Sequence, residues 1–175
     1  WEGKRLRIKQ QYVLSSASLQ DMLRTFKIAH GDDLSRFAEF YAVQLNDTHP
    51  AMSIPELIRL LMAEGMSFDD AFNVAQKTFS YTNHTVMGEA LEKWQLDLMR
   101  SVVPEIVDII CRIDQKLKWE HPGLFIVKDN TAHMANLSIY VSTYVNGVAE
   151  IHSQILKDDL FRDWYQVFPD RFQNK

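Results

Sequence analysis

QLNDTHPAMSIPELIRLL, residues 44–61, contains the change from strand through polar turn to helix on which the fold depends. The apolar, β-prone run 40–45 leads into the polar turn 46–50 (NDTHP), and a helical pattern follows at once. Pro55 suits the first turn of that helix, where an N–H would be unpaired anyway, and Gly65 suits its end, because glycine tolerates the left-handed conformation found there. We therefore expect a strand, a short polar turn and a helix, in that order.

Further strands and helices are expected on both sides of this stretch. Residues 11–14 and 137–145 are rich in β-branched and aromatic side chains, which favours strands. Helices are expected from Ser18 to Gly31, from Ser67 to about Asn83, over 89–119 with a break at Pro104, and over 148–156. Alternating strands and helices predict a helix-rich α/β fold with a mainly parallel sheet, in which ligands bind beyond the carboxyl ends of the strands.

Two of these helices carry specific signals. Ser67, followed three residues later by Asp70, is typical of a capped helix start. Beyond Pro104, four isoleucines recur at helical spacing and predict a buried stripe: Ile106, Ile109, Ile110 and Ile113.

Composition narrows the class of protein. The chain has 175 residues, 46% of them hydrophobic, which is enough for one domain with a substantial core. A formal net charge of -4 gives no basic surface of the kind that binds nucleic acid, and no stretch reaches the roughly 18 apolar residues that span a membrane. The single cysteine, Cys111, lies in an apolar run, where we expect it to be buried in a protein of the reducing cytoplasm.

The turn Asp47-Thr48-His49 is the first of three polar clusters. At the carboxyl end of a strand, its carboxylate and imidazole stand where α/β proteins contact their ligands. Two other interpretations stay open. Asp47 and Thr48 can instead cap free N–H groups ahead of Pro50. Asp47 and His49 can also join His84 in a metal site, although the histidine spacing matches no zinc motif.

The second cluster, residues 81–85 (YTNHT), is expected at the end of a helix. Its donors and acceptors suit a polyhydroxylated ligand, and the alternative is a histidine that interacts with the helix dipole. The third cluster is residues 146–149 (NGVA), with His152 one turn on, where Gly147 allows the backbone to approach a ligand closely. A plain strand-to-helix turn is the alternative there. From the residues alone, a sugar or small-molecule site in an α/β domain is indicated.

Four blocks of the sequence resemble the glycogen and maltodextrin phosphorylases, in the same order and with fitting gaps. They are QLNDTHPAMSIPELIRLL, YTNHTVMGEALEKW, VNGVAEIHSQILK and FPDRFQNK, and the upstream LRIKQQYVLSSASLQDMLRTFK extends the likeness over the whole chain. The resemblance implies a partial Rossmann-like domain of a two-domain glycosyltransferase (GT-B-like) fold. Residues 1–175 would form a single segment from the latter part of the N-terminal domain, approaching the domain junction, and the C-terminal cofactor domain would be absent from this chain.

The same resemblance implies a reaction. Enzymes of this family cleave the terminal α-1,4-linked glucose of a glucan with inorganic phosphate and release glucose 1-phosphate. Their cofactor is pyridoxal phosphate, carried on a lysine of the second domain, and substrate phosphate acts with the cofactor phosphate as the proton donor. No catalytic residue is therefore expected in this segment, and the isolated chain is expected to be inactive.

Site residues follow from the resemblance by position. His84 would contact the 6-hydroxyl of the glucose, and Asn83 and Thr85 would shape the loop that holds it. The full set of expected glucose-binding residues is Asp47, His49, His84, Gly147 and Val148. No metal is expected among them, and the complete enzyme is expected to be a cytoplasmic homodimer that binds neither nucleic acid nor membrane.

Two departures from the family pattern carry further expectations. Gly88 stands where the family usually has proline, which should loosen the entry to the following helix. Arg24-Thr25 stands where the nucleotide-activated animal enzymes have two arginines, so activation by that nucleotide is not expected. Without its partner domain, the chain is also expected to expose apolar surface near Trp94 and Trp164.

Two other functions remain open at this point. One is a stand-alone carbohydrate-binding or interaction module that keeps the pocket lining without catalysis. The other is a small metal hydrolase built on Asp47, His49 and His84, which requires a bound metal.

Overall fold

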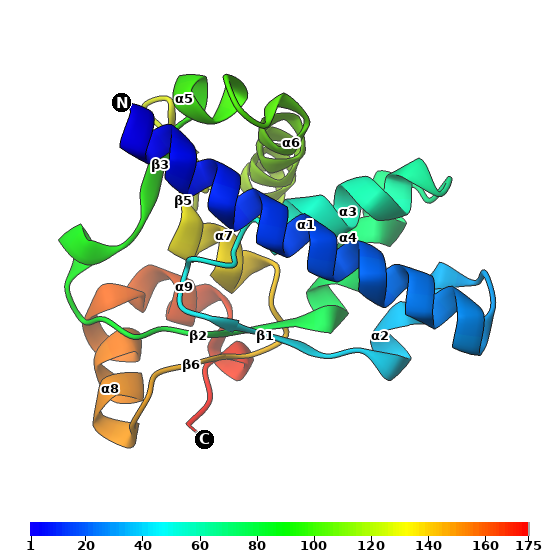
Figure 1. Ribbon diagram of the computed structural model, residues 1–175. Coiled ribbons are helices and arrows are strands. Elements are labelled where there is room, and N and C mark those ends of the chain that lie inside the picture. Colours follow the sequence, from blue (N-terminus) through cyan, green and yellow to red (C-terminus); the bar gives the residue numbers. More distant parts are fainter. Residues whose placement is uncertain (175) are drawn as a thin grey trace.

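The computed structural model describes residues 1–174, in which helices surround two small sheets (Figure 1). The first sheet is entirely parallel and has the strand order β1-β2-β6. Its strands are β1 (Val43–Asn46), β2 (Phe79–Thr82) and β6 (Val145–Asn146). The helix-rich α/β class and the parallel sheet predicted from the sequence are therefore confirmed.

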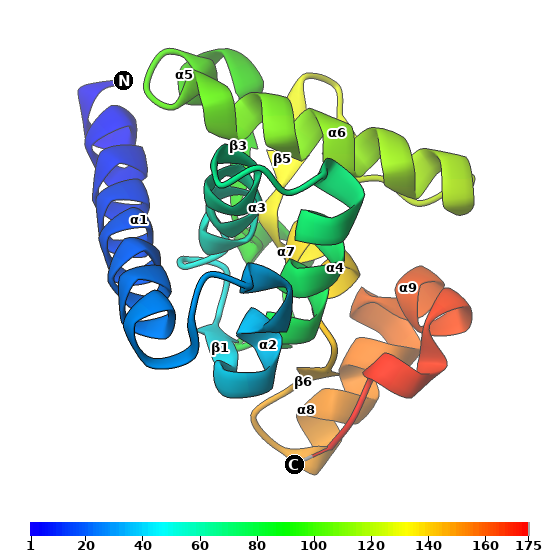
Figure 2. The same ribbon diagram turned by 90° about the vertical axis from the view of Figure 1, so that its right-hand side faces the viewer.

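The second sheet is antiparallel and was not expected. Its order is β3-β5-β4, with bounds Lys93–Gln95, Thr131–His133 and Val127–Lys128 respectively. The helices are α1 (Glu2–His30), α2 (Phe37–Phe40), α3 (Ser53–Ala63), α4 (Phe68–Thr78), α5 (Leu96–Arg100), α6 (Pro104–Glu120), α7 (Met134–Tyr140), α8 (Glu150–Ile155) and α9 (Arg162–Val167). Figure 2 shows α1 along one side of the molecule and α8 and α9 on the other.

The region around the opening stretch folds as predicted. The strand β1 ends at the polar turn, Pro55 lies in the first turn of α3, and Gly65 takes a φ of 97° just beyond that helix. The Ser67 hydroxyl caps α4 by accepting a hydrogen bond from the N–H of Asp70 at 3.1 Å. The helix α6 begins at Pro104 and buries its isoleucine stripe as expected.

Three predicted segments were assigned to the wrong element. Residues 11–14 and Ser18 lie inside α1, which is one continuous helix of 29 residues ending at Gly31. Residues 137–140, predicted as strand, belong to α7. In both places packing against neighbouring elements outweighs the β propensity of single side chains.

Two further boundaries differ from the expectation. The chain from Phe79 to Thr82 is a strand, so α4 ends at Thr78 rather than near Asn83. The segment 89–103, expected as helix, instead contains a short 3₁₀ turn, the strand β3 and the five-residue α5. The element that follows the polar cluster 81–85 is therefore a three-residue turn, Gly88–Ala90, and not a long helix.

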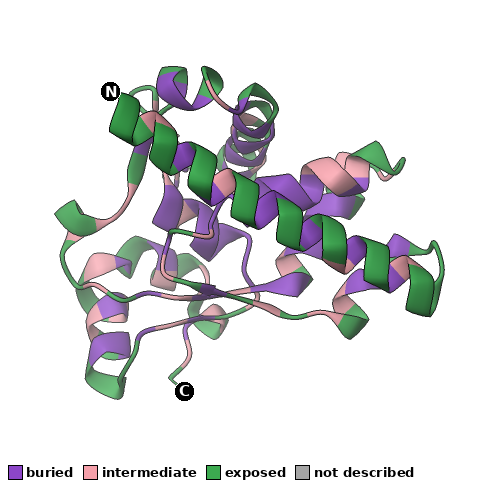
Figure 3. Cartoon of the chain, in the orientation of Figure 1, coloured by how far each residue is buried: buried purple, intermediate pink, exposed green. Residues whose placement is uncertain are grey.

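The core lies between α1, α3, α6, α7 and the parallel sheet (Figure 3). Trp94 and Trp164 are 7% and 5% exposed, so neither ring forms the exposed apolar surface expected there, although Val167, in the same helix as Trp164, is 39% exposed. Exposed apolar side chains are spread over several elements. They lie on α1 (Leu6, Val13, Leu14 and Ile28), at Trp119, and beside the polar clusters at Val86, Met87, Val148 and Ile151. Cys111, expected to be buried, is only half-buried.

Candidate functional site

The three polar clusters lie at one edge of the parallel sheet. Each follows the carboxyl end of a strand: 47–49 follows β1, 83–85 follows β2 and 147–148 follows β6. Backbone hydrogen bonds continue one residue past the strands, from the Asp47 N–H to the Thr82 carbonyl and from the Asn83 N–H to the Asn146 carbonyl, both 2.9 Å. The second cluster was predicted at the end of a helix, but it lies at the end of β2. Because β2 lies between β1 and β6 in the sheet, all three clusters are at the same edge.

Asp47 makes the turn after β1 in an unusual backbone conformation. Its φ is 66°, in the left-handed region that aspartate enters more readily than most residues. One carboxylate oxygen accepts the N–H of Thr48 at 2.7 Å, and Thr48 itself is 2% exposed. Neither residue caps α3, whose N-cap is Met52. The capping interpretation therefore accounts for one N–H group, that of Thr48 in the turn. It does not account for the N–H groups at the start of α3, which receive no side-chain cap.

His49 points out of the same turn and is largely exposed. Its Nδ1 lies 3.8 Å from Oε1 of Glu92, a carboxylate that also accepts a 2.8 Å hydrogen bond from Gln11 of α1. A groove of about 670 Å³ runs between α1 and His49-Pro50. Sequence reasoning did not identify Glu92, because nothing in its local pattern indicates that it faces the turn after β1.

Hydrogen bonds hold the loop on either side of His84, and the one between Asn83 and Tyr81 is buried. The Asn83 side chain is fully buried; its amide donates to the Tyr81 phenol at 2.9 Å and its carbonyl oxygen accepts the Thr85 N–H at 2.9 Å. The Thr85 hydroxyl in turn accepts the Met87 N–H at 3.1 Å. Between these fixed residues His84 is exposed to solvent.

Tyr81 stays neutral beneath this loop. Burial raises the pKa of the Tyr81 phenol well above its ordinary value, and the charge of Asp47 adds to that rise while the hydrogen bond from Asn83 opposes it. A neutral phenol can therefore serve as a fixed hydrogen-bond partner under the site at any ordinary pH.

The loop after β6 is held by residues of α8. The Gly147 N–H donates to the Ser153 hydroxyl at 3.1 Å, and the Val148 N–H donates to Nδ1 of His152 at 3.1 Å. A Cβ on Gly147 would lie 2.8 Å from Cγ of His152 and 2.9 Å from the backbone nitrogen of Ser153, so glycine is required for this close approach. Val148 is 57% exposed, and its side chain is what the loop presents outward.

The described residues give a metal site no support. Within residues 1–174 no three side chains of the His, Cys, Asp and Glu types come close enough to hold a metal ion, so Asp47, His49 and His84 do not form the metal centre considered above. In the same residues, no helix has both the length and the apolar character needed to cross a bilayer.

The chain is thus an α/β segment with polar side chains at the carboxyl ends of adjacent parallel strands, the position at which ligands bind in open α/β sheets. Residues 1–175 match the carbohydrate phosphorylase family, and the chain belongs to that family. The resemblance seen in the four sequence blocks is thereby confirmed.

Similar proteins cover nearly all of this chain. An alpha-glucan phosphorylase, H isozyme, of Triticum aestivum is 45% identical over 99% of the chain and 23% of its own length. Glycogen phosphorylase 2 of Dictyostelium discoideum is 43% identical over 99% and 19%, and the maltodextrin phosphorylase of Streptococcus pneumoniae is 42% identical over 99% and 23%. The chain therefore spans less than a quarter of the length of these relatives.

Proposed function

We propose that this chain supplies part of the glucose-binding side of an α-glucan phosphorylase active site. The reaction is cleavage of a terminal α-1,4-linked glucose by inorganic phosphate, with release of glucose 1-phosphate. The observation that carries the proposal is the meeting of the three polar clusters at one sheet edge, in a chain of the carbohydrate phosphorylase family. A sugar presents many hydroxyl groups, and a site for it needs several oriented donors and acceptors that converge from different loops.

The proposed binding residues are Asp47, His49, His84, Gly147 and Val148. His49 and His84 are exposed at the edge and keep imidazole nitrogens available for hydroxyl groups, and Asp47 is half-buried beside them. The N–H groups of Gly147 and Val148 already donate to α8, so we assign to this pair a shaping role through close backbone packing and the exposed Val148 side chain. Asn83 and Thr85 position His84 through the hydrogen bonds on both sides of it.

The residues present here do not fit pyridoxal phosphate, the cofactor that the family implies. An imine-forming lysine must lose its proton, which a lowered pKa favours. No lysine occurs in the loops 47–52, 83–88 or 147–152 at the sheet edge. Elsewhere, the half-buried Lys116 has its pKa raised by hydrogen bonds to Glu120 and Asp69. We therefore propose that the lysine that carries the cofactor lies outside this chain.

The wider architecture is part of the same proposal. We propose that the segment is the latter part of the N-terminal domain of a two-domain, GT-B-like enzyme, whose Rossmann-like character the three-stranded parallel sheet supports. A cytoplasmic homodimer, and the inactivity of the isolated chain, stay predictions of the family resemblance.

The test is phosphorolysis by the complete polypeptide that contains this chain. Maltoheptaose and phosphate are supplied, glucose 1-phosphate is followed, and His84→Ala is compared with His30→Ala. His30 is an exposed histidine in the last turn of α1, stacked on Phe40 and remote from the sheet edge, so it is a matched control. We expect phosphate-dependent release that falls by about 100-fold or more in His84→Ala, because misplacing a sugar by about 1 Å costs about that factor, and stays at the wild-type rate in His30→Ala.

Other outcomes separate the alternatives. Release that is equal in both variants would remove His84 from the glucose site while leaving the phosphorylase assignment intact. A complete polypeptide that binds maltoheptaose and releases no glucose 1-phosphate would instead favour the carbohydrate-binding module without catalysis.

A further inference from the structure

His152 is a buried histidine whose two ring nitrogens contact two different loops of the candidate site. It lies in α8 and is 7% exposed. Its Nδ1 is 3.1 Å from the Val148 nitrogen, and its Nε2 is 3.0 Å from the Thr85 carbonyl oxygen. The ring therefore spans the space between the loop after β6 and the loop after β2.

The partners of the ring define its protonation state. A backbone N–H can only donate, so Nδ1 must offer it a lone pair and carries no hydrogen. A carbonyl oxygen can only accept, so Nε2 must carry the hydrogen and donate it to Thr85. Both contacts are satisfied together only by the neutral ring with its proton on Nε2.

The contacts of the ring connect it to the residues assigned to glucose. Thr85 follows His84 directly, and Val148 is itself one of the assigned residues. Gly147 packs on the ring so closely that a Cβ would come within 2.8 Å of it, and Ser153, the next residue of α8, accepts the Gly147 N–H. One turn of α8 therefore holds the third loop and sets its distance from the second.

We propose that His152 is a positioning residue of the active site, which fixes the separation of the His84 loop and the Gly147-Val148 loop through its Nε2–H tautomer. The expected effect of His152 on the reaction rate rests on the function proposed above. The expected tautomer of the His152 ring does not depend on that function. It does not touch the sugar, because its nitrogens are both engaged by backbone groups.

The first test observes the tautomer in the chain itself. Long-range proton–nitrogen correlation spectra of protein labelled with ¹⁵N in its histidines report which ring nitrogen carries the proton, and loss of a signal set in His152→Gln identifies His152. We expect an unprotonated Nδ1 and a protonated Nε2 at neutral pH. In protein that circular dichroism shows to be folded, a proton on Nδ1, or exchange-averaged signals typical of a ring free in solvent, would overturn the proposal.

The second test separates the two hydrogen bonds by substitution in the complete polypeptide. His152→Asn places a carbonyl oxygen near the position of Nδ1 and keeps an acceptor for Val148, and His152→Gln places an amide nitrogen near the position of Nε2 and keeps a donor for Thr85. His152→Phe keeps the ring volume and removes both bonds. We expect kcat/KM for maltoheptaose to fall by about 100-fold in the Phe variant, as for a displaced binding group, and by about 10-fold in each of the other two.

A control and a second readout keep this test specific. His121→Phe makes the same chemical change at a half-buried histidine that packs edge-on against Phe168, away from the sheet edge, and is expected to leave kcat/KM unchanged. Circular dichroism shows that each variant is folded. If wild-type protein is active and folded His152→Phe is equally active, the positioning role is wrong. If wild-type protein shows no phosphorolysis while the tautomer is as expected, the function fails and the hydrogen-bond assignment stands.

Discussion

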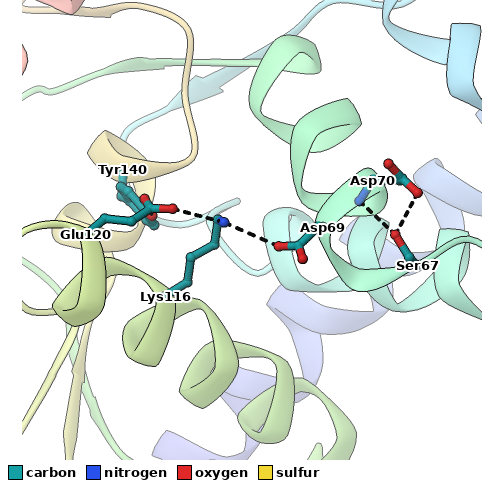
Figure 4. A network of polar contacts seen from close by, with 6 residues as sticks. All are labelled: Ser67, Asp69, Asp70, Lys116, Glu120 and Tyr140. Carbon is teal, nitrogen blue, oxygen red and sulfur yellow. Dashed lines mark hydrogen bonds and ion pairs between the residues drawn. The ribbon is translucent and has the colours of Figure 1, made fainter.

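Two polar regions of this molecule use their side chains in opposite ways. At the carboxyl edge of the parallel sheet, neutral buried groups satisfy one another, and the ionisable side chains Asp47, His49 and His84 remain at least partly open to solvent. Between α4, α6 and α7, the ionisable side chains satisfy one another (Figure 4). The first arrangement leaves groups free for a ligand, and the second uses its groups to join helices.

The second region is the Lys116 network. The Nζ atom of Lys116 lies 2.9 Å from Oε1 of Glu120 and 3.2 Å from Oδ1 of Asp69, and the Tyr140 hydroxyl donates to Oε2 of Glu120 at 2.6 Å (Figure 4). These contacts connect α4, α6 and α7. Burial and the adjacent Glu120 carboxylate raise the pKa of Tyr140, so the phenol keeps the proton that it donates.

The largest expected effect is at the sheet edge, from Gly147→Ala. The added methyl group would meet the His152 ring and the Ser153 backbone nitrogen below 3.0 Å, and backbone cannot move aside cheaply. We expect a loss of about 2 to 3 kcal/mol in the free energy of unfolding, the upper part of the range for an overpacked site, measured by urea denaturation. An unchanged midpoint would mean that α8 can shift away from the loop.

Tyr140→Phe tests the Lys116 network and should cost less. It removes one hydrogen bond to a carboxylate and leaves the Lys116 pair with Glu120 in place. We expect a loss of about 1.5 kcal/mol, the lower end for a hydrogen bond to a charged group, since Glu120 is partly exposed. The rate of phosphorolysis of the complete polypeptide should not change, because this network does not border the sheet edge; a parallel loss of activity would contradict the separation of the two regions.

Acid should weaken the Lys116 network before it disrupts the buried groups at the sheet edge. Burial opposes ionisation of Glu120, but hydrogen bonds from Tyr140 and Lys116 outweigh it and hold the pKa of Glu120 below its ordinary value of 4.5. Because the folded-state pKa is the lower one, this stabilisation is present above pH 4.5 and is lost as the pH falls through the folded-state pKa. Urea midpoints of wild type and Glu120→Gln, compared between pH 7 and 3, should differ by a constant amount down to about pH 4.5 and converge below it. A gap that stays constant over the whole range would exclude Glu120 as the source.

The smallest effect is expected from Gly88→Pro, a counterpart to Gly147 on the second loop. Met87 before it is extended, as a residue preceding proline must be, and a Cβ at Gly88 would meet only Leu160 at an ordinary 3.6 Å. Gly88 also begins a 3₁₀ turn, where proline is well tolerated. We expect a gain of about 0.5 to 1 kcal/mol through a less flexible unfolded chain, read from the same urea curves. Destabilisation would show that the glycine is needed for the loop conformation.

The sequence predicted the parts of the fold in which local signals and burial agree. The strand before the polar turn, the helix between Pro55 and Gly65, and the Ser67 cap all form as expected. Helix α1 was misread in part because its buried stripe contains polar residues, while apolar side chains such as Val13 face solvent. One of the buried polar residues, Ser16, donates a 2.6 Å hydrogen bond to the fully buried Glu56 of α3, a partner that only the tertiary structure reveals.

Helix α7 was missed for a different reason. It is buried almost all round, so it shows no amphipathic period, and its side chains Ile139 and Tyr140 favour strands when considered alone. The Ser138 hydroxyl donates to the Met134 carbonyl within the helix, which removes the need for an outside partner.

The candidate site was predictable in its exposed part. Two clusters are visible because polar side chains interrupt apolar sequence at Asp47 and His84, and the third because Asn146-Gly147 breaks a β-prone run. The groups beneath them were not found, because Glu92 and Ser153 acquire their partners only when separate elements meet. His152 was noticed one turn after Gly147, but its contact with Thr85 joins positions 67 residues apart and leaves no local signal.

The backbone hydrogen bonds that continue the sheet past its strands affect how chimeras can be built between this segment and related phosphorylases. Because Asp47 pairs with Thr82 and Asn83 pairs with Asn146, the three loops leave the sheet in a common register. Side-chain contacts also cross between the loops, from Thr82 to Asn146 and from His152 to the Thr85 carbonyl, so a chimera that imports one loop from another phosphorylase must also match these partners. Residues 47–49, 83–88 and 146–153 should therefore be exchanged as one block, and libraries that shuffle them separately should contain few functional members.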